Sequence, residues 1–257
     1  MNTFEWIRKS TAHNHDADET LNHLHSNSHF TYLDYSFNFE HPFTCVVSGP
    51  TMSGKSVFVK NLIDIAHKKI KPSPDRVHYH YGTWQPLFET MPTVSFFEGL
   101  PSLETFSSSS ESSSSTLVII DDLMSDVNGE ISDFFTKGAH HKNLSVIYIC
   151  QNLFHNNRVQ RTININSQYL ILFKNPRDIL QVQFLGRSIL GRNSSEFESI
   201  YLHATSRAHG YLLVNLRQNT PDEFRFLTYV LHDHPKNSLN YKHCDVYVLD
   251  RFLENYK

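Results

Sequence analysis

An eight-residue loop with two glycines at fixed spacing constrains the fold of this chain more than any other feature. Its sequence, Gly49-Pro50-Thr51-Met52-Ser53-Gly54-Lys55-Ser56, has the form G-x-x-x-x-G-K-S. The apolar run 43–47 precedes the loop, and residues 57–63 follow it as the predicted first turns of a helix. When a strand, a glycine loop and a helix occur in this order, backbone N–H groups and the helix N-terminus face a phosphate group. The segment therefore predicts a P-loop fold that binds a nucleotide.

The side chains that end this loop indicate how the nucleotide is held. Lys55 has the position that reaches the β- and γ-phosphates, and the hydroxyl of Ser56 has the position that contacts Mg²⁺. We therefore expect ATP and Mg²⁺ as cofactors. The residues expected to contact the nucleotide are Gly49, Pro50, Thr51, Met52, Ser53, Gly54, Lys55, Ser56 and Val57.

A pair of acidic residues follows a second apolar run. Residues 117–120 are leucine, valine and isoleucine, and Asp121 and Asp122 come directly after them. Such a run is typical of a central parallel strand that is covered on both faces. Because ligands collect at the carboxyl ends of parallel strands, we expect Asp121 to hold Mg²⁺ and Asp122 to orient or deprotonate the attacking water. The alternative, a pair of acids that cap a helix N-terminus, is disfavoured by the complete P-loop.

Polar amides end a third apolar run. Residues 145–150 are mostly apolar, and Gln151 and Asn152 follow them. An amide there needs a hydrogen-bond partner, and the γ-phosphate or the attacking water would be one for Gln151. The alternative is a strand end with solvated amides. Together with the P-loop and the acid pair, this element indicates an ATPase with an extra strand between the P-loop strand and the acid strand. A polar residue on that strand separates it from simple nucleotide kinases.

Strands and helices alternate along the chain, which predicts an α/β fold with a mostly parallel central sheet flanked by helices. We expect a polar, His-rich N-terminal tail at 1–28 and a single P-loop ATPase domain at 29–257. Between 107 and 115 every residue except Glu111 is serine, which predicts a flexible loop inserted into the domain. The other expected elements are strands at 76–81, 93–97, 169–173 and 211–214, helices at 131–137 and from about 178, and a strand or hairpin at 30–39.

Composition excludes several classes of protein. No apolar stretch approaches the roughly 20 residues of a membrane span, and the N-terminus lacks the apolar core of a signal peptide. Three cysteines form no disulfide framework, which indicates an intracellular protein with reduced thiols. A net charge of −3 argues against a generally basic nucleic-acid coat protein, but not against a motor that touches DNA through a few loops. The histidines of the tail favour a mobile polar segment over a metal site, since nothing completes a tetrahedral ligand set.

The motifs above resemble those of viral genome-packaging ATPases of the FtsK/HerA superfamily. The resemblance is closest to the poxvirus-type packaging ATPases of large DNA viruses, Polinton elements and adintovirus-like genomes. It spans about residues 40–230 and is most specific in the block 140–154, which begins His140-His141 and ends Gln151-Asn152-Leu153-Phe154. Asp122 departs from the pattern, because many members carry glutamate there, and the family does not explain the serine run. The other matching positions are 49–56, 119–124, Asn166, 172–178, Gln181, 209–214 and 220–222.

The resemblance implies a RecA-like fold of the additional-strand type and a homo-oligomeric ring, a pentamer or hexamer. In such a ring a neighbour's arginine completes each site and stabilises charge on the transferring phosphoryl group. Arg158 and Arg187 are the first candidates, with Arg161 and Arg192 as further ones. The implied partners are double-stranded DNA and proteins of the viral capsid or portal vertex. The implied location is the host cell, in the nucleus or a cytoplasmic virus factory, with association with the virion.

Three functions compete for this combination of motifs. The favoured one is ATP-driven translocation of double-stranded DNA into a preformed capsid, with a largely sequence-independent grip on phosphates. A P-loop kinase or other small-molecule phosphotransferase would need a lid with several arginines and no polar residue on an extra strand. A non-hydrolysing capsid-assembly factor is disfavoured by the intact Lys55, Ser56, Asp121 and Gln151.

Overall fold

The computed structural model describes residues 30–106, 114–121, 123, 129–138, 143–153, 158–177, 179–231 and 243–249. The predicted tail at 1–28, Asp122 and most of the serine run lie outside the described residues. So do residues 140–142 and 154 of the block 140–154. The chain divides into two compact units, one spanning Asn38–Asn175 and the other formed by the residues before and after it. The expectation of one domain over 29–257 stays a prediction.

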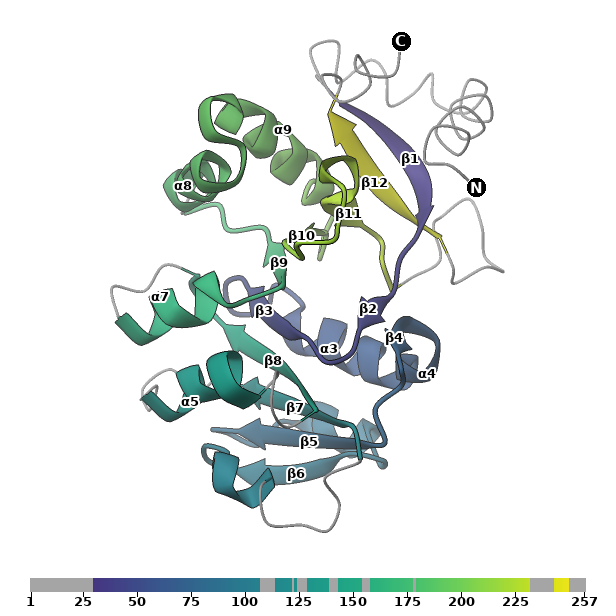
Figure 1. Cartoon of the computed structure of the whole chain (residues 1–257), viewed down its shortest axis with the longest axis vertical. Coiled ribbons are helices and arrows are strands. Elements are labelled where there is room, and N and C mark those ends of the chain that lie inside the picture. The colour runs from purple at the N-terminus through teal and green to yellow at the C-terminus, as the bar shows by residue number, and fades with distance from the viewer. Residues whose placement is uncertain are drawn as a thin grey trace. The chain divides into compact units, whose positions relative to one another are not determined.

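The unit Asn38–Asn175 is built around a parallel sheet (Figure 1). Its six described strands have the order β9-β3-β8-β7-β5-β6, and all neighbouring pairs are parallel. β8 separates the P-loop strand β3 from the acid strand β7, so the predicted extra strand is confirmed. The bounds are β3 (Thr44–Ser48), β5 (Arg76–Tyr81), β6 (Ser95–Glu98), β7 (Thr116–Asp121), β8 (Leu144–Cys150) and β9 (Tyr169–Phe173).

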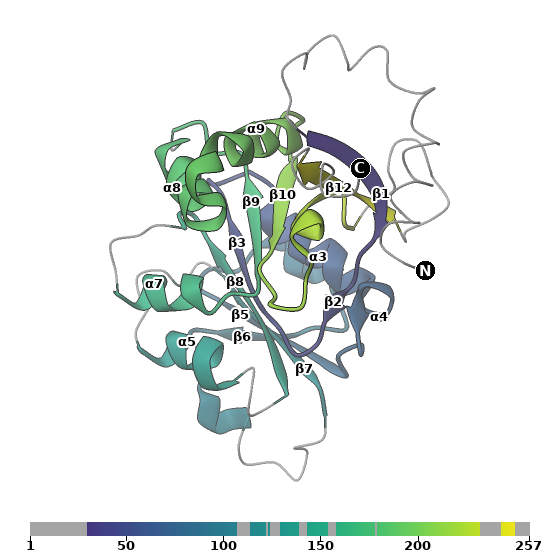
Figure 2. The same ribbon diagram turned by 45° about the horizontal axis from the view of Figure 1, so that its top comes forward.

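Helices cover both faces of this sheet, as the continuous burial of β3, β7 and β8 requires. α3 (Lys55–Asp64) lies on the face that carries the Asp121 side chain, because Ser56 in its first turn is hydrogen-bonded to that carboxylate. A π-helical turn (Phe134–Gly138) lies on the other face, where Phe134 contacts Phe106 and Phe106 contacts His78. Figure 2 shows α5 (Gly129–Asp133) and α7 (Arg158–Ile165) on the side opposite to α3. The prediction of a helix-flanked, mostly parallel sheet is confirmed.

Short elements complete the described part of this unit. The helix predicted to begin at 57–63 is interrupted at Ile65, whose φ of −112° is not helical, so α3 is followed by a separate α4 (Ala66–Lys69). β2 (Phe39–Glu40) and β4 (Ile70–Lys71) form a parallel pair of their own. Two 3-10 turns lie at Pro86–Thr90 and Leu103–Phe106.

The described part of the other unit contains an antiparallel sheet and a helical pair. Its strands have the order β1-β12-β11-β10. Helices α8 and α9 pack closely, since a Cβ at Gly186 would lie 3.0 Å from the Cβ of Phe197. The bounds are β1 (Phe30–Ser36), β10 (Tyr211–Asn215), β11 (Phe226–Thr228), β12 (His243–Leu249), α8 (Ile179–Leu190) and α9 (Ser194–Ala204), with 3-10 turns at Gly191–Asn193 and Asp222–Phe224.

The segment 30–39 contains the expected strand but not a hairpin. β1 pairs antiparallel with β12, from Phe30 opposite Leu249 to Ser36 opposite His243. β2 pairs with β4 instead of with β1. The prediction of extended structure at 30–39 therefore carried no information about the partner strand, which lies near the other end of the chain.

The end of the serine run leads into the sheet. Ser115 is buried immediately before β7, and its N–H and hydroxyl both donate to the Asp75 carboxylate, at 2.8 and 3.1 Å. These bonds lower the pKa of Asp75. Ser114 accepts a hydrogen bond from Arg76. The last two residues of the predicted insertion are thus anchored to the start of β5, and residues 107–113 lie outside the described residues.

The described residues contain no helix that is long and apolar enough to cross a membrane. Cys45 on β3 and Cys150 on β8 are free, buried thiols, as expected. Burial raises the pKa of both thiols, that of Cys150 to about 12. Neither thiol is therefore a reactive thiolate at neutral pH.

Candidate nucleotide-binding site

The P-loop lies between β3 and α3, where two glycines are required for different reasons. Gly54, the N-cap residue of α3, has a φ of +109°. This left-handed conformation is strained for a residue that carries a side chain. Gly49 has no room for a side chain: a Cβ there would lie 2.6 Å from the Cβ of Phe173 and 2.8 Å from Oγ of Ser53. The N–H of Gly49 also donates to the carbonyl of Cys150 at 3.3 Å, which ties the loop to the end of β8.

The loop curls around the Lys55 ammonium group. Nζ donates to the carbonyls of Gly49 at 2.7 Å and Pro50 at 2.9 Å, so the positive charge is held over the start of the loop. The first turn of α3 has no acidic residue and no side-chain cap. Its N–H groups, the positive end of the helix dipole and the Lys55 charge therefore act together on an anion. These residues fit the phosphates of a nucleotide.

Asp121 and Ser56 form a pair of oxygen ligands beside the loop. The Ser56 hydroxyl donates to Oδ2 of Asp121 at 3.3 Å, and Asp121, the last residue of β7, is only 4% exposed. Carboxylate and hydroxyl oxygens are what Mg²⁺ takes from a protein when nucleotide phosphates supply further ligands. The Ser56–Asp121 pair therefore fits Mg²⁺ bound together with a nucleotide.

Tyr79 contributes a contact that the sequence did not indicate. Its hydroxyl donates to the same oxygen of Asp121 at 2.6 Å, and the residue is fully buried on β5. β5 is the neighbour of β7 in the sheet, on the side away from β8. The sequence predicted the strand at 76–81 correctly, but only the strand order shows which residue of β5 faces Asp121.

The other predicted residues have less defined settings. Gln151 is exposed and follows directly on Cys150, at the edge of the sheet where Gly49 begins the P-loop. Asp122 lies outside the described residues. Arg158 is exposed at the start of α7. Arg187 is exposed on α8, where its guanidinium lies 6.0 Å from the centre of the Phe184 ring. The catalytic roles of these four residues stay predictions.

Exposure separates the outer residues of the loop from the inner ones. Met52, at the tip, is 91% exposed and has a φ of +65°, and Thr51 and Val57 are also exposed. Lys55 and Ser56 are only half-buried, which leaves them accessible at the loop's mouth. The structure thus brings Lys55, Ser56 and Asp121 together as predicted, with the N-terminal turn of α3.

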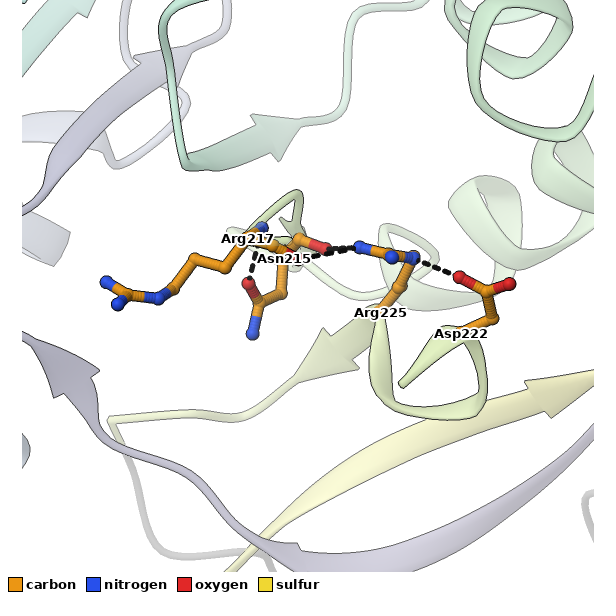
Figure 3. Close-up of polar contacts among 4 residues, drawn as sticks. All are labelled: Asn215, Arg217, Asp222 and Arg225. Carbon is orange, nitrogen blue, oxygen red and sulfur yellow. Dashed lines mark hydrogen bonds and ion pairs between the residues drawn. The ribbon is translucent and has the colours of Figure 1, made fainter. Parts of the chain in front are cut away.

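A separate polar cluster shapes the turn between β10 and β11 in the other unit (Figure 3). Arg225 forms an ion pair with Asp222 at 2.7 Å and donates to the carbonyls of Asn215 at 3.1 Å and Arg217 at 3.2 Å. The side chain of Asn215 accepts from the N–H of Arg217 at 3.2 Å. Asp222, which lies in the segment 220–222 that resembles the packaging ATPases, therefore pairs with Arg225 and closes this turn.

Comparison with known proteins returns matches among solved structures alone. No family model matches the sequence, and no curated protein matches it significantly. One similar structure is the genome packaging NTPase B204 from Sulfolobus turreted icosahedral virus 2 in complex with ATP-gammaS. It has a TM-score of 0.46 and 15% identity, over 70% of this chain and 94% of that chain. The same NTPase in complex with AMPPCP gives a TM-score of 0.45 and 15% identity, over 70% and 95% of the two chains. Because both TM-scores lie below 0.5, the fold assignment rests on the strand order and loop geometry.

Proposed function

We propose that this chain is the ATPase subunit of a motor that moves double-stranded DNA into a viral capsid. The observation that supports ATP hydrolysis is the meeting of Lys55, Ser56 and Asp121 at one edge of a parallel sheet, with β8 between β3 and β7. The assignment to DNA packaging rests on the sequence resemblance, above all on the block 140–154.

Each residue of the site has a defined task in this proposal. Lys55 and the N–H groups at the start of α3 bind and orient the phosphates. Ser56 and Asp121 supply protein oxygen ligands for Mg²⁺, which neutralises charge on the phosphates when it is bound. Asp122 and Gln151 orient the attacking water, with Asp122 accepting its proton. Gly49 and Gly54 allow the backbone to approach the phosphates closely.

The finer parts of the proposal concern assembly. The chain forms a homo-oligomeric ring, a pentamer or hexamer, in which Arg158 or Arg187 of a neighbouring subunit acts on the transferring phosphoryl group. Both arginines are exposed, as a residue that acts in another subunit must be before assembly. The partners are double-stranded DNA and capsid or portal proteins, and the site of action is the host nucleus or a cytoplasmic virus factory. Contacts to DNA phosphates make binding salt-dependent.

Release of inorganic phosphate from ATP tests the catalytic part of the proposal. We expect Mg²⁺-dependent release by the full chain and its loss in Lys55→Ala. Lys60→Ala is the matched control, because Lys60 lies on the same helix and pairs with Asp64 at the surface. Robust transfer of phosphate to a nucleoside, in place of release to water, would show that the chain is a P-loop phosphotransferase.

A further inference from the structure

Tyr79 reaches Asp121 along a diagonal across two neighbouring strands. In the register of β5 and β7, Tyr79 lies opposite Ile119, and Tyr81 lies opposite Asp121. The phenol therefore has to lean two residues toward the carboxyl end of the sheet, a reach that an aromatic side chain allows. The result is a 2.6 Å hydrogen bond from the Tyr79 hydroxyl to Oδ2 of Asp121.

The Tyr79 hydroxyl donates this hydrogen bond, and the Asp121 carboxylate accepts it. At 2.6 Å the bond has the short length of hydrogen bonds from a hydroxyl to a carboxylate, which are among the stronger ones in proteins. Both residues are buried, since Tyr79 is fully covered and Asp121 is only 4% exposed, so the bond gives a partner to a carboxylate that is largely shielded from water.

Aromatic packing holds the phenol in this position. The Tyr79 ring lies 4.9 Å from the ring of Phe88 and 5.4 Å from that of Phe96, measured between centroids. Phe88 and Phe96 are themselves stacked at 4.9 Å. The direction of the hydroxyl is thus set by the packing of the ring against the sheet and the Pro86–Thr90 turn.

We propose that Tyr79 is a positioning residue, which holds the Asp121 carboxylate in the orientation that binds the divalent cation of a nucleotide complex. This inference rests on the proposed function. Ser56 and Tyr79 both donate to Oδ2 of Asp121. The Tyr79 bond is the shorter of the two, 2.6 against 3.3 Å. As a metal ligand Ser56 has to place its oxygen toward the ion, whereas Tyr79 binds no ion in this proposal and its hydroxyl is free to hold the carboxylate throughout. Hydrogen-bonded partners of metal ligands set ligand orientation in this way.

The test measures how strongly a metal ion promotes nucleotide binding, without any turnover. A fluorescent, non-hydrolysable ATP analogue is titrated into the full-length protein in EDTA and in Mg²⁺. The quantity determined is the ratio of the dissociation constant in EDTA to the dissociation constant in Mg²⁺. We expect Tyr79→Phe, which keeps the ring and its packing, to reduce this ratio on the order of tenfold. The affinity in EDTA should stay that of the wild type, because the Lys55 and α3 contacts are unchanged.

Two variants bracket the expected effect. Tyr81→Phe is the matched control: Tyr81 lies on the same strand and packs against Trp84 and Phe88, so removing its hydroxyl should leave the ratio unchanged. Asp121→Asn removes the negative charge of the ligand and should reduce the ratio at least as much as Tyr79→Phe. Thermal unfolding of each variant confirms that the fold is retained.

The possible outcomes separate this inference from the proposed function. A wild-type ratio in Tyr79→Phe overturns the positioning role and leaves the ATPase proposal standing. An equal loss of affinity in EDTA and in Mg²⁺ also overturns it, because it shows general damage to the loop. A wild-type protein whose nucleotide affinity does not respond to Mg²⁺ overturns both.

Discussion

Phe173 on β9 leaves no space for a side chain at Gly49. The Cβ of Phe173 would lie 2.6 Å from a Cβ added to Gly49. Since the Cβ of Phe173 is attached to the β9 backbone, the conflict is relieved only if the loop or the strand moves. The first glycine of the loop is therefore required by close packing between neighbouring strands, and the second, Gly54, by its φ of +109°.

Gly49→Ala should destabilise the protein and weaken nucleotide binding together. Overpacking of this kind costs about 1–3 kcal/mol in free energy of unfolding, and the displaced loop carries Lys55 away from the phosphates. Thermal unfolding and titration with a fluorescent nucleotide measure the two effects. Thr51→Ala, at an exposed position of the same loop, is the control and should unfold like the wild type. Wild-type stability of Gly49→Ala would contradict the close contact with Phe173.

Ser56→Ala and Asp121→Asn should raise the Mg²⁺ concentration needed for half-maximal hydrolysis. Ser56→Ala removes one of two oxygen ligands that lie 3.3 Å apart, and Asp121→Asn removes the negative charge of the other. For Asp121→Asn the required Mg²⁺ concentration should rise on the order of tenfold or more. The measurement is phosphate release at saturating ATP over a range of Mg²⁺ concentrations. Asp64→Asn, at the end of α3, serves as the control. An unchanged Mg²⁺ requirement in Asp121→Asn would exclude this aspartate as a metal ligand.

Gln151→Ala should slow hydrolysis more than it weakens nucleotide binding. Gln151 follows β8 at the edge where the P-loop begins, and a residue that orients the attacking water contributes roughly 100-fold to the rate. Single-turnover hydrolysis gives the rate, and nucleotide titration gives the affinity. Gln218→Ala, at an exposed position beyond β10, is the matched control. Parallel losses of rate and affinity would indicate that Gln151 binds nucleotide instead.

Folding stability should fall at acidic pH, with His80 as one cause. Burial lowers the pKa of His80 to about 4, and its Nε2 is buried without a hydrogen-bond partner among the described residues. The neutral form is therefore favoured in the folded state, whereas the unfolded chain binds a proton near pH 6.5. The contribution of His80 to stability is complete above about pH 6.5 and is lost as the pH falls toward 4. The loss in free energy of unfolding is at most about 3 kcal/mol. Burial lowers the pKa of His41 and His78 as well, which acts in the same direction.

Chemical denaturation at several pH values between 7 and 4 measures this dependence. His80→Phe should flatten it, because phenylalanine can keep the stacking on Phe97 without a titrating group. His67→Phe, at an exposed position of α4, is the control and should follow the wild-type curve. If His80→Phe shows the full wild-type dependence on pH, other groups cause it.

Local sequence patterns predicted the strands and the loop because both depend on short-range chemistry. The strands predicted at 76–81 and 169–173 are β5 and β9, with the bounds that the structure shows. The G-x-x-x-x-G-K-S spacing predicted the P-loop because both glycines are required locally. Gly54 needs a positive φ, and Gly49 lies too close to Phe173 on the neighbouring strand to carry a side chain. Lys55, Ser56 and Asp121 followed from the positions at which these elements end.

Strand order decided what the sequence could not show. The Tyr79–Asp121 hydrogen bond exists because β5 lies beside β7. The amino-acid pattern of a strand does not indicate which strand lies next to it in the sheet. The pairing of β1 with β12 joins segments near the two ends of the chain. The bonds from Ser115 to Asp75 likewise required the spatial proximity of two residues that are 40 positions apart. Each of these contacts is set by tertiary structure.

The most direct test of the proposed motor is the steady-state ATPase rate with and without long double-stranded DNA. We expect Mg²⁺-dependent hydrolysis that DNA of unrelated sequences stimulates equally, and a stimulation that weakens as salt is raised. Hydrolysis should be absent in Lys55→Ala but present in Lys60→Ala. Robust hydrolysis or phosphate transfer that no DNA alters at low salt would contradict DNA translocation as the function of this chain.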